Sequence, residues 1–204
     1  MNMSKVVENT DAQIKKVAFL KGLILGGVLL VLNIFSFYFI TTMTTSLYLI
    51  IGAPFLFAVV LPLVVSISLI LELRKSIGGY WVFKQAVTGV FIMFFSAYII
   101  QIIGRDLLFA KVIEPHMVEK TGEAIINATT QMLEKVSTNQ AQIDEKIADM
   151  QKQFKEQSNQ SVVTFFEGIG VTIILLFVLT LIFGAIFKKD PPLLAIDSDE
   201  ESVE

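Results

Sequence analysis

The chain has 204 residues, of which 54% are hydrophobic and 17% are charged, and its mean hydropathy is +0.69. Soluble domains are about 25% charged, so this composition, with its long uncharged stretches, is typical of a membrane protein. The formal net charge of −3 argues against a nucleic-acid-binding protein. The lack of cysteine excludes disulfides and thiolate sites, and the single histidine excludes multi-histidine metal motifs.

The chain opens with a polar amino-terminal segment, residues 1–16, and an apolar run over residues 17–40 that only Lys21 interrupts. A secretory signal peptide has an apolar core of roughly 7–15 residues followed by a small-residue cleavage site. This run is longer and ends in aromatic residues without such a site, so we interpret it as a retained first membrane span. Gly22 and Gly26 either form a close helix-packing face or reflect the general frequency of glycine in membrane helices.

The second predicted span covers residues 47–73 and contains Pro54 and Pro62. Each proline removes a backbone donor and tends to kink a helix, and neighbouring groups can compensate for this in a membrane. The two prolines indicate either a gate or a bent structural helix.

A basic turn with two glycines leads into the third predicted span, residues 82–103. Tyr80 and Trp81 suit a position at the level of the lipid headgroups. The helix is expected to continue into water past Arg105. It should be interrupted at Glu114, because the residue before a proline disfavours α geometry.

Residues 113–160 form a polar insert in which apolar side chains return at helical spacing between charged ones. The pattern resembles a coiled-coil heptad and predicts an amphipathic helical insert. Its predicted apolar face consists of Ile143, Ile147, Met150 and Phe154. Because Ser137 begins a stretch typical of a helix stop and a new N-cap, the insert is either one long helix or, as we prefer, two helices with a turn there.

The fourth span is predicted over residues 161–187, and residues 188–204 form an acidic tail in which Pro191 and Pro192 block any continuation of the helix. The first three spans lie within residues 17–112. The predicted fold class is therefore all-α: an integral membrane protein with four transmembrane helices and an amphipathic helical insert between the third and fourth.

The distribution of cations predicts the orientation. In a four-span chain with its amino terminus inside, every short cytoplasmic segment would be basic, whereas the first link carries no charge. The cations concerned are Lys5, Lys15, Lys16, Lys21, Arg74, Lys75, Lys84, Lys188 and Lys189. Because Lys and Arg in short segments stay on the cytoplasmic side, both termini are predicted to be cytoplasmic and the insert extracytoplasmic.

The stretch at residues 74–86, Arg-Lys-Ser-Ile-Gly-Gly-Tyr-Trp-Val-Phe-Lys-Gln-Ala, resembles a family of uncharacterised four-span membrane proteins from Bacteroidetes, domain of unknown function 4199. Glu114-Pro115, the insert and the final Lys188-Lys189 extend the resemblance over residues 15–192. The sequence at residues 136–139 departs from the Met-Ser-Glu-Glu cap often found there in the family, which puts the two-helix form in doubt. The resemblance implies a bacterial inner-membrane location and brings no activity, substrate, cofactor or catalytic residue.

Two groups of charged residues suggest possible sites. Glu167 near the start of the last span and Arg105 at the outer end of the third lie at similar depth, and charge within a membrane is costly. Either these two form a structural pair, or each reaches water separately with Asp106 as the partner of Arg105. His116 and acidic residues on the same helix face could hold a metal ion, although a solvated helix start is the favoured interpretation.

No phosphate-binding loop, nucleophile elbow or zinc-protease motif is present, so no catalytic, cofactor-binding or metal-ligating residue is predicted. The favoured function is that of a structural or interaction protein, not an enzyme, which presents its insert to a protein partner, to a second copy of itself or to the lipid surface. The alternative is a small transporter or channel component, for which Asn33 and Gln101 within the spans give thin support. A membrane enzyme acting on lipid is the third possibility.

Overall fold

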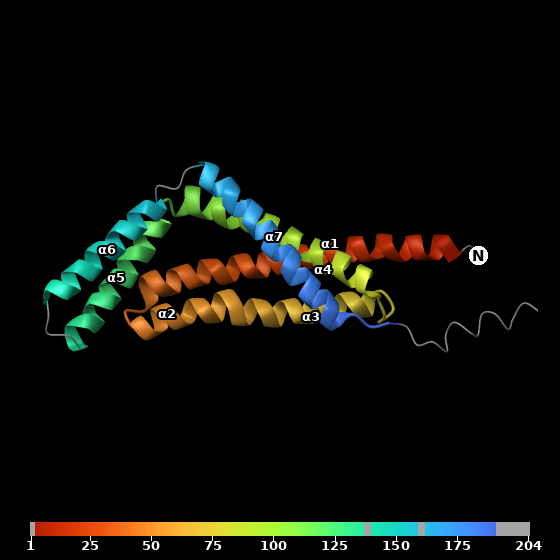
Figure 1. Cartoon of the computed structure of the whole chain (residues 1–204), viewed down its shortest axis with the longest axis horizontal. Helices are drawn as coiled ribbons and strands as arrows, with labels where there is room; N and C mark the ends of the chain where they lie inside the picture. The colour runs from red at the N-terminus through yellow and green to blue at the C-terminus, as the bar shows by residue number, and fades with distance from the viewer. Residues whose placement is uncertain (1–2, 137–139, 159–161, 191–204) are drawn as a thin grey trace, which may run out of the picture. The chain divides into compact units, whose positions relative to one another are not determined.

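The computed structural model describes residues 3–136, 140–158 and 162–190, and within these ranges the chain is built from helices (Figure 1). Four helical stretches are long and apolar enough to cross a membrane, which confirms the predicted all-α, four-span class. These stretches are Asp11–Met43, Leu47–Ser76, Phe83–Ile113 and Val163–Phe187.

The first span ends in a π-helical turn, and the second span is interrupted by one. The first consists of α1 (Met3–Tyr38) and η1 (Phe39–Met43). The second consists of α2 (Leu47–Phe55), η2 (Leu56–Val60) and α3 (Leu61–Ser76). In η2 the amide of Leu61 donates to the carbonyl of Leu56, five residues back. This widened turn comes directly before Pro62, whose ring would clash with the carbonyl four residues earlier in a regular α-helix.

The third span also ends in π geometry, as α4 (Phe83–Gln101) passes into η3 (Ile102–Ile113). The helix stops at Glu114, whose amide donates to the carbonyl of Phe109 at 2.8 Å. Pro115 follows, so the break falls where the sequence placed it, although the π geometry before it was not predicted.

The insert contains two helices, α5 (Met117–Val136) and α6 (Gln140–Ser158), and the last span is α7 (Val162–Phe187). The turn expected at Ser137 and the acidic tail from Pro191 lie outside the described residues. In Figure 1, α6 runs alongside α5, and the two helices pack on each other. We refer to them together as the α5–α6 pair.

The chain divides into two compact units. Unit 1 contains the beginnings of α1 and α4 and the ends of α3 and α7. In unit 1, α1 packs closely on α4 near Gly22, and α7 packs on α4 near Gly184. Fully buried side chains from α1, α3 and α4 form its core: Ile14, Ile70, Leu73, Val90 and Met93.

A set of hydrogen bonds ties the span ends of unit 1 together. The indole of Trp81, 1% exposed, donates to the carbonyl of Phe187 at 2.8 Å, and the backbones of Trp81 and Lys189 form an antiparallel bridge. The amide of Gln85 donates to Asp11 at 3.0 Å. The basic turn after α3 is thus fixed against the end of α7, with Gly78 at φ 101° and Gly79 at φ 85° supplying the left-handed backbone it needs.

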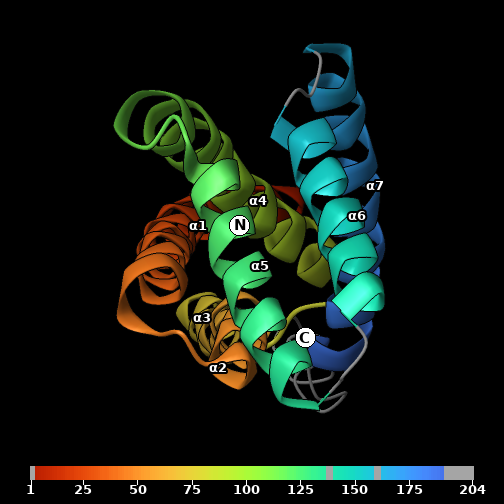
Figure 2. The same ribbon diagram turned by 90° about the vertical axis from the view of Figure 1, so that its left-hand side faces the viewer.

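Unit 2 holds the remaining parts of the spans together with the α5–α6 pair. Its apolar core joins η1, α2 and α5 through the buried residues Ile40, Ile50 and Ala128. Figure 2 shows α5 running close to α2, in agreement with their contacts. The insert is therefore anchored on the link between the first two spans.

Candidate functional site

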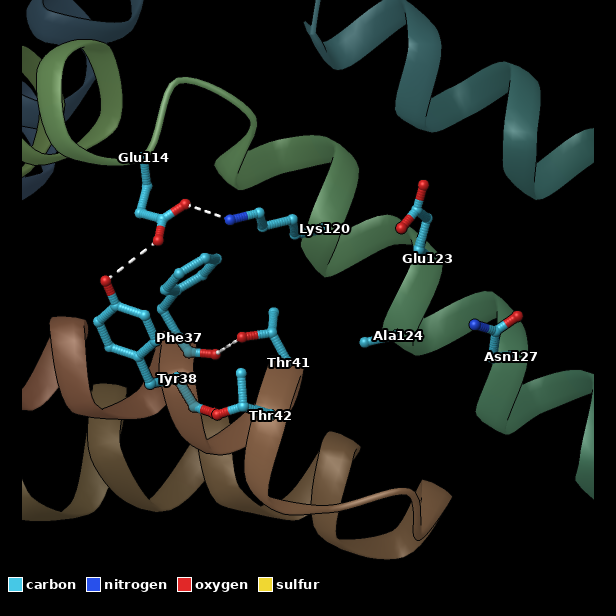
Figure 3. Close-up of a pocket in the computed structure, with 9 residues that line it drawn as sticks. All are labelled: Phe37, Tyr38, Thr41, Thr42, Glu114, Lys120, Glu123, Ala124 and Asn127. Carbon is cyan, nitrogen blue, oxygen red and sulfur yellow. Dashed lines mark hydrogen bonds and ion pairs between the residues drawn. The ribbon is translucent and has the colours of Figure 1, made fainter.

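A pocket of about 360 Å³ opens in unit 2 between the end of the first span and α5 (Figure 3). The first span contributes Phe37 and Tyr38 from the last turn of α1, followed by the two threonines of η1. The other wall comes from Glu114 and from side chains of α5. The volume lies near the lower end of the roughly 300–1,000 Å³ typical of small-molecule pockets.

Glu114 is the centre of the polar contacts in this pocket. The phenol of Tyr38 donates a hydrogen bond to Glu114 Oε1 at 3.1 Å, and Lys120 Nζ donates to Glu114 Oε2 at 2.5 Å. Figure 3 shows the carboxylate between these two donors. The geometry follows from the chain break, since the backbone leaves the helix at Glu114 and re-enters one at Met117, which places Lys120 in the first helical turns beyond it.

The ion pair shifts both titrations in the direction expected of opposite charges. The hydrogen bond from Lys120 holds the pKa of Glu114 below its usual value, and the bond from Tyr38 acts in the same direction. The hydrogen bond to Glu114 raises the pKa of Lys120. The pair therefore stays charged over a wider pH range than either group would alone.

These shifts predict how the start of α5 responds to pH. The stabilisation from Glu114 is present above the unfolded pKa of glutamate, about 4.3, and is lost as the pH falls through the lower folded value. The stabilisation from Lys120 is present below the unfolded pKa of lysine, about 10.4, and is lost as the pH rises through the raised pKa of Lys120 in the folded chain. We expect amide hydrogen exchange at the start of α5, corrected for intrinsic rates, to accelerate below about pH 4.

The matched variants are Glu114→Gln and Glu134→Gln, the second on an exposed part of α5 away from the pocket. Glu114→Gln should show the faster exchange already at neutral pH and respond little to acid. Glu134→Gln should behave like the unmodified chain. An acid response that persists unchanged in Glu114→Gln would mean that another group controls the start of α5.

The remaining polar lining is already oriented by the backbone. The hydroxyls of Thr41 and Thr42 donate to the carbonyls of Phe37 and Tyr38 at 2.9 and 2.6 Å. On α5, Glu123 and Asn127 line the pocket one helical turn apart and are both exposed. Since Glu114 already accepts two hydrogen bonds, its carboxylate is engaged in structure, and the lining is suited to binding rather than to proton abstraction by this group.

The possible pair of Arg105 and Glu167 falls within unit 2. Arg105 Nε lies 3.6 Å from Asp106 Oδ1, which is the alternative partner named above. No ion pair between Arg105 and Glu167 occurs among the described residues. Among the described residues of η3 and α7, Lys111 Nζ lies 5.6 Å from the centroid of the Phe165 ring.

The two glycines predicted to pack, Gly22 and Gly26, make different contacts in the structure. A Cβ on Gly22 would lie 2.5 Å from the carbonyl oxygen of Met93 and 2.7 Å from the Cβ of Ser96, so α1 and α4 approach as closely as a glycine permits. Gly26 is buried, and its carbonyl accepts a hydrogen bond from Gln101 at 2.9 Å.

The predicted apolar residues of the insert are all at least partly buried. Ile143 is 2% exposed, and Ile147, Met150 and Phe154 are half-buried. The Phe154 ring covers Gly122 of α5, where an added Cβ would lie 2.8 Å from Cγ of Phe154. This contact joins the far end of α6 to the first half of α5. The charged residues between them on α6, such as Asp144 and Lys152, are exposed.

Asn33 and Gln101, considered above as signs of a pathway, bond to each other. The Asn33 amide donates to Gln101 Oε1 at 3.1 Å and to the carbonyl of Leu29 at 2.9 Å. They form an interhelical link between α1 and the end of α4 in unit 2. Such bonds in membrane proteins contribute ~0.6 kcal/mol on average and ~1.7 kcal/mol at most.

We therefore expect Gln101→Leu to lower the free energy of unfolding by about 0.6–1.7 kcal/mol for each bond lost, because the Asn33 amide and the Gly26 carbonyl both lose their partner across the helices. Ile103→Leu, at an exposed apolar position two residues along, serves as the control. The measurement is the free energy of unfolding in mixed micelles. Equal stabilities of the two variants would show that the link contributes nothing.

Sequence reasoning did not identify the contacts of Glu114 with Tyr38 and Lys120. The sequence signal that could have suggested the contact with Lys120 is Glu114-Pro115. A carboxylate at a helix break lies close to the first turns of the next helix, where a lysine can reach it. A second pairing that the sequence did not indicate is that of Lys21 and Glu72, which form an ion pair between α1 and α3 in unit 1. This pair offsets the cost of placing either charge near the membrane.

Searches among curated proteins and among solved structures found no significant match. A family model with the description "Protein of unknown function (DUF4199)" matches residues 20–189. The matched range includes the pocket, the α5–α6 pair and nearly all of the four spans. The chain therefore belongs to the DUF4199 family of proteins of unknown function.

Proposed function

We propose that this protein is a membrane-anchored interaction protein that presents the α5–α6 pair to a protein partner outside the cytoplasm. One observation carries the proposal: the insert is built as a docked module. Ala128 of α5 is buried with Ile40 and Ile50, which lie at the end of the first span and the start of the second. The apolar side of the pair is used for packing within unit 2, and an outward row of charges remains.

The exposed side of α6 is densely charged and carries both signs. Its exposed charged side chains are Asp144, Glu145, Lys146, Asp149, Lys152, Lys155 and Glu156. Mixed charges of this kind select a partner with a complementary pattern and steer its approach more than they add raw affinity. A protein surface is therefore the favoured partner over a uniformly anionic lipid surface.

The orientation belongs to the same proposal. Lys15, Lys16 and Lys75 are exposed near the start of the first span and the end of the second, and Lys188 and Lys189 follow the last. The link between the first two spans has no charge. By the positive-inside rule, we expect both termini in the cytoplasm and the α5–α6 pair outside it. The bacterial inner membrane is proposed only on the family resemblance described above.

A pull-down in mild detergent tests the proposal. The intact chain is compared with a chain lacking residues 118–154 and with the charge reversal Lys146→Glu plus Lys152→Glu. We expect one or more proteins retained by the intact chain to be lost with the deletion and reduced by the reversal. Reversal of Lys15 and Lys16 to Glu, on the other proposed side of the membrane, is the control and should change nothing in this set. Identical retention by all four chains would overturn the proposal.

A small transporter or channel component is the second candidate, and η2 is the observation that favours it. A π turn between Pro54 and Pro62 in the middle of a span is a local weakness of the kind that often occurs at functional sites. If this candidate is right, solute flux in proteoliposomes should depend on the prolines, and Pro62→Ala should change the flux rate without changing the melting temperature. Vesicles that remain as tight as protein-free ones would exclude it.

A further inference from the structure

In unit 1, the ends of three membrane spans meet at one basic surface. Arg74 Nη1 lies 3.4 Å from the carbonyl oxygen of Phe187, the last residue of α7, so the ends of α3 and α7 lie together (Figure 1). The backbone of Trp81, just before α4, pairs with that of Lys189 through hydrogen bonds of 2.9 and 3.1 Å. These contacts bring cations from two distant parts of the chain to one place. We call this group the basic surface, and it consists of Arg74, Lys188 and Lys189.

The cations of the basic surface have hydrogen-bonding capacity left to offer a ligand. A guanidinium has five N–H donors, and Arg74 directs one of them to the carbonyl of Phe187. The ammonium of Lys189 lies 5.0 Å from the centroid of the Tyr80 ring, and the side chain is exposed. Among the described residues, no carboxylate forms an ion pair with any of the three cations, not even Asp190, which directly follows Lys189. The surface is therefore positively charged and open to an anion.

Exposed apolar side chains lie next to these cations. Val82 and Phe83, at the start of the third span, are 44% and 43% exposed, and Ile186, at the end of the fourth, is 67% exposed. Because they are at the ends of the spans, these residues lie at the boundary between the lipid headgroups and the acyl chains. Cations beside apolar side chains at this depth match a phospholipid, in which a phosphate and acyl chains belong to one molecule. A soluble anion would use only the cations.

We propose that the basic surface binds the headgroup of an anionic phospholipid, with its phosphate at Arg74 and Lys189 and its acyl chains along Val82 and Phe83. The headgroup supplies the negative charge that these cations lack among the described residues, and clustered basic residues at span ends attract anionic lipids in this way. The proposal requires only that the surface lies at headgroup depth. It is therefore independent of the side of the membrane that the surface faces and of the protein partner of the α5–α6 pair.

The single tryptophan of the chain gives a direct readout of this surface. The indole of Trp81 donates at 2.8 Å to the same carbonyl of Phe187 that Arg74 contacts. Bromine atoms on an acyl chain quench indole fluorescence at short range. The full chain is reconstituted in mixtures of phosphatidylglycerol and phosphatidylcholine in which one of the two lipids is brominated. We expect brominated phosphatidylglycerol to quench Trp81 more strongly than brominated phosphatidylcholine at the same mole fraction.

Two variants and a matched control locate the preference. Arg74→Gln and Lys189→Gln should each reduce it roughly five-fold, since one basic residue near an anionic membrane surface contributes about that factor. The control is Lys15→Gln, which removes the same charge from an exposed position in the same unit. Gln13 is the side chain of α1 that reaches the end of α3, at 3.2 Å from the carbonyl of Ser76. Lys15, two residues further on, lies on another face of α1, so this variant should keep the full preference.

The preference is a ratio for two lipids, so a change in the exposure of the indole cancels. Equal quenching by the two brominated lipids, a full preference in both Arg74→Gln and Lys189→Gln, or an equal loss in Lys15→Gln would each overturn the proposal. Inorganic phosphate that removes the preference, when chloride at the same ionic strength does not, would overturn it in favour of a soluble anion. A preference that emerges only after residues 191–204 are deleted would overturn it as well and assign the surface to the acidic tail.

Discussion

Ile143→Asp is expected to separate α6 from α5. The side chain is 2% exposed on a helix that packs along α5, so the substitution removes a buried apolar side chain and places a carboxylate in its position. Together, the two effects should weaken the packing of α6 on α5 by ~2–5 kcal/mol. The expected result is rapid cleavage of α6 by a soluble protease in detergent, under conditions in which the unmodified chain is cut slowly.

The matched control is Ala148→Asp, which introduces the same charge into the same helix at an exposed position. It should leave the cleavage rate near that of the unmodified chain, and Ile147→Asp, at a half-buried position, should fall between the two. If Ile143→Asp and Ala148→Asp are cut at the same rate, α6 has no specific apolar face.

Gly22→Ala is expected to force α1 away from α4. The new Cβ would lie 2.5 Å from a backbone oxygen, that of Met93, and 2.7 Å from the Cβ of Ser96. Neither is the far end of a flexible side chain, so the helices themselves must shift. Overpacking of this kind costs ~1–3 kcal/mol. At ~2–4 °C per kcal/mol for a chain of this size, the melting temperature should fall by several degrees.

Gly27→Ala tests whether this loss comes from the close approach. It lies on the same helix, and in the described part of the chain no atom outside the local helix lies within 4 Å of an added Cβ. Alanine is a better helix former than glycine by ~1 kcal/mol, so this variant should melt at the same temperature or slightly higher. A drop in both variants would indicate that helix flexibility, rather than packing, is what the glycines provide.

The number of spans was predictable because it depends on chain length and hydrophobicity alone. A stretch such as Val163–Phe187 reads as a membrane helix whatever its neighbours are. The end of the third span at Glu114 was predictable for a similar reason, since the geometry before Pro115 is a local property. In α6, the spacing of Ile143 and Phe154 was also sufficient to place both on the packed side.

The contacts between segments were not predictable because they depend on register. Asn33 and Gln101 are 68 residues apart, and nothing in either segment shows that they meet at the same height. The same holds for Tyr38 and Glu114, 76 residues apart. The bonds of Glu114 belong to the candidate site, so the site itself emerged only from the folded chain.

The π-helical segments were predictable only in part. Two prolines flank η2, and the kink there was expected, but η3 contains no proline. Its sequence includes Arg105 and Asp106, and local propensity does not distinguish a π turn from an α turn in such a stretch. The sequence alone therefore carried no signal for the π geometry of η3.

The proposed topology is tested most directly by the accessibility of single cysteines, which the cysteine-free chain allows without background. Glu145→Cys in α6, Lys75→Cys after the second span and Asp190→Cys after the fourth all lie at exposed positions. Intact cells are treated with a membrane-impermeant maleimide. The proposed topology predicts labelling at position 145, with positions 75 and 190 labelled only after the membrane is opened. Labelling of 75 or 190 in intact cells, or protection of 145, would contradict it.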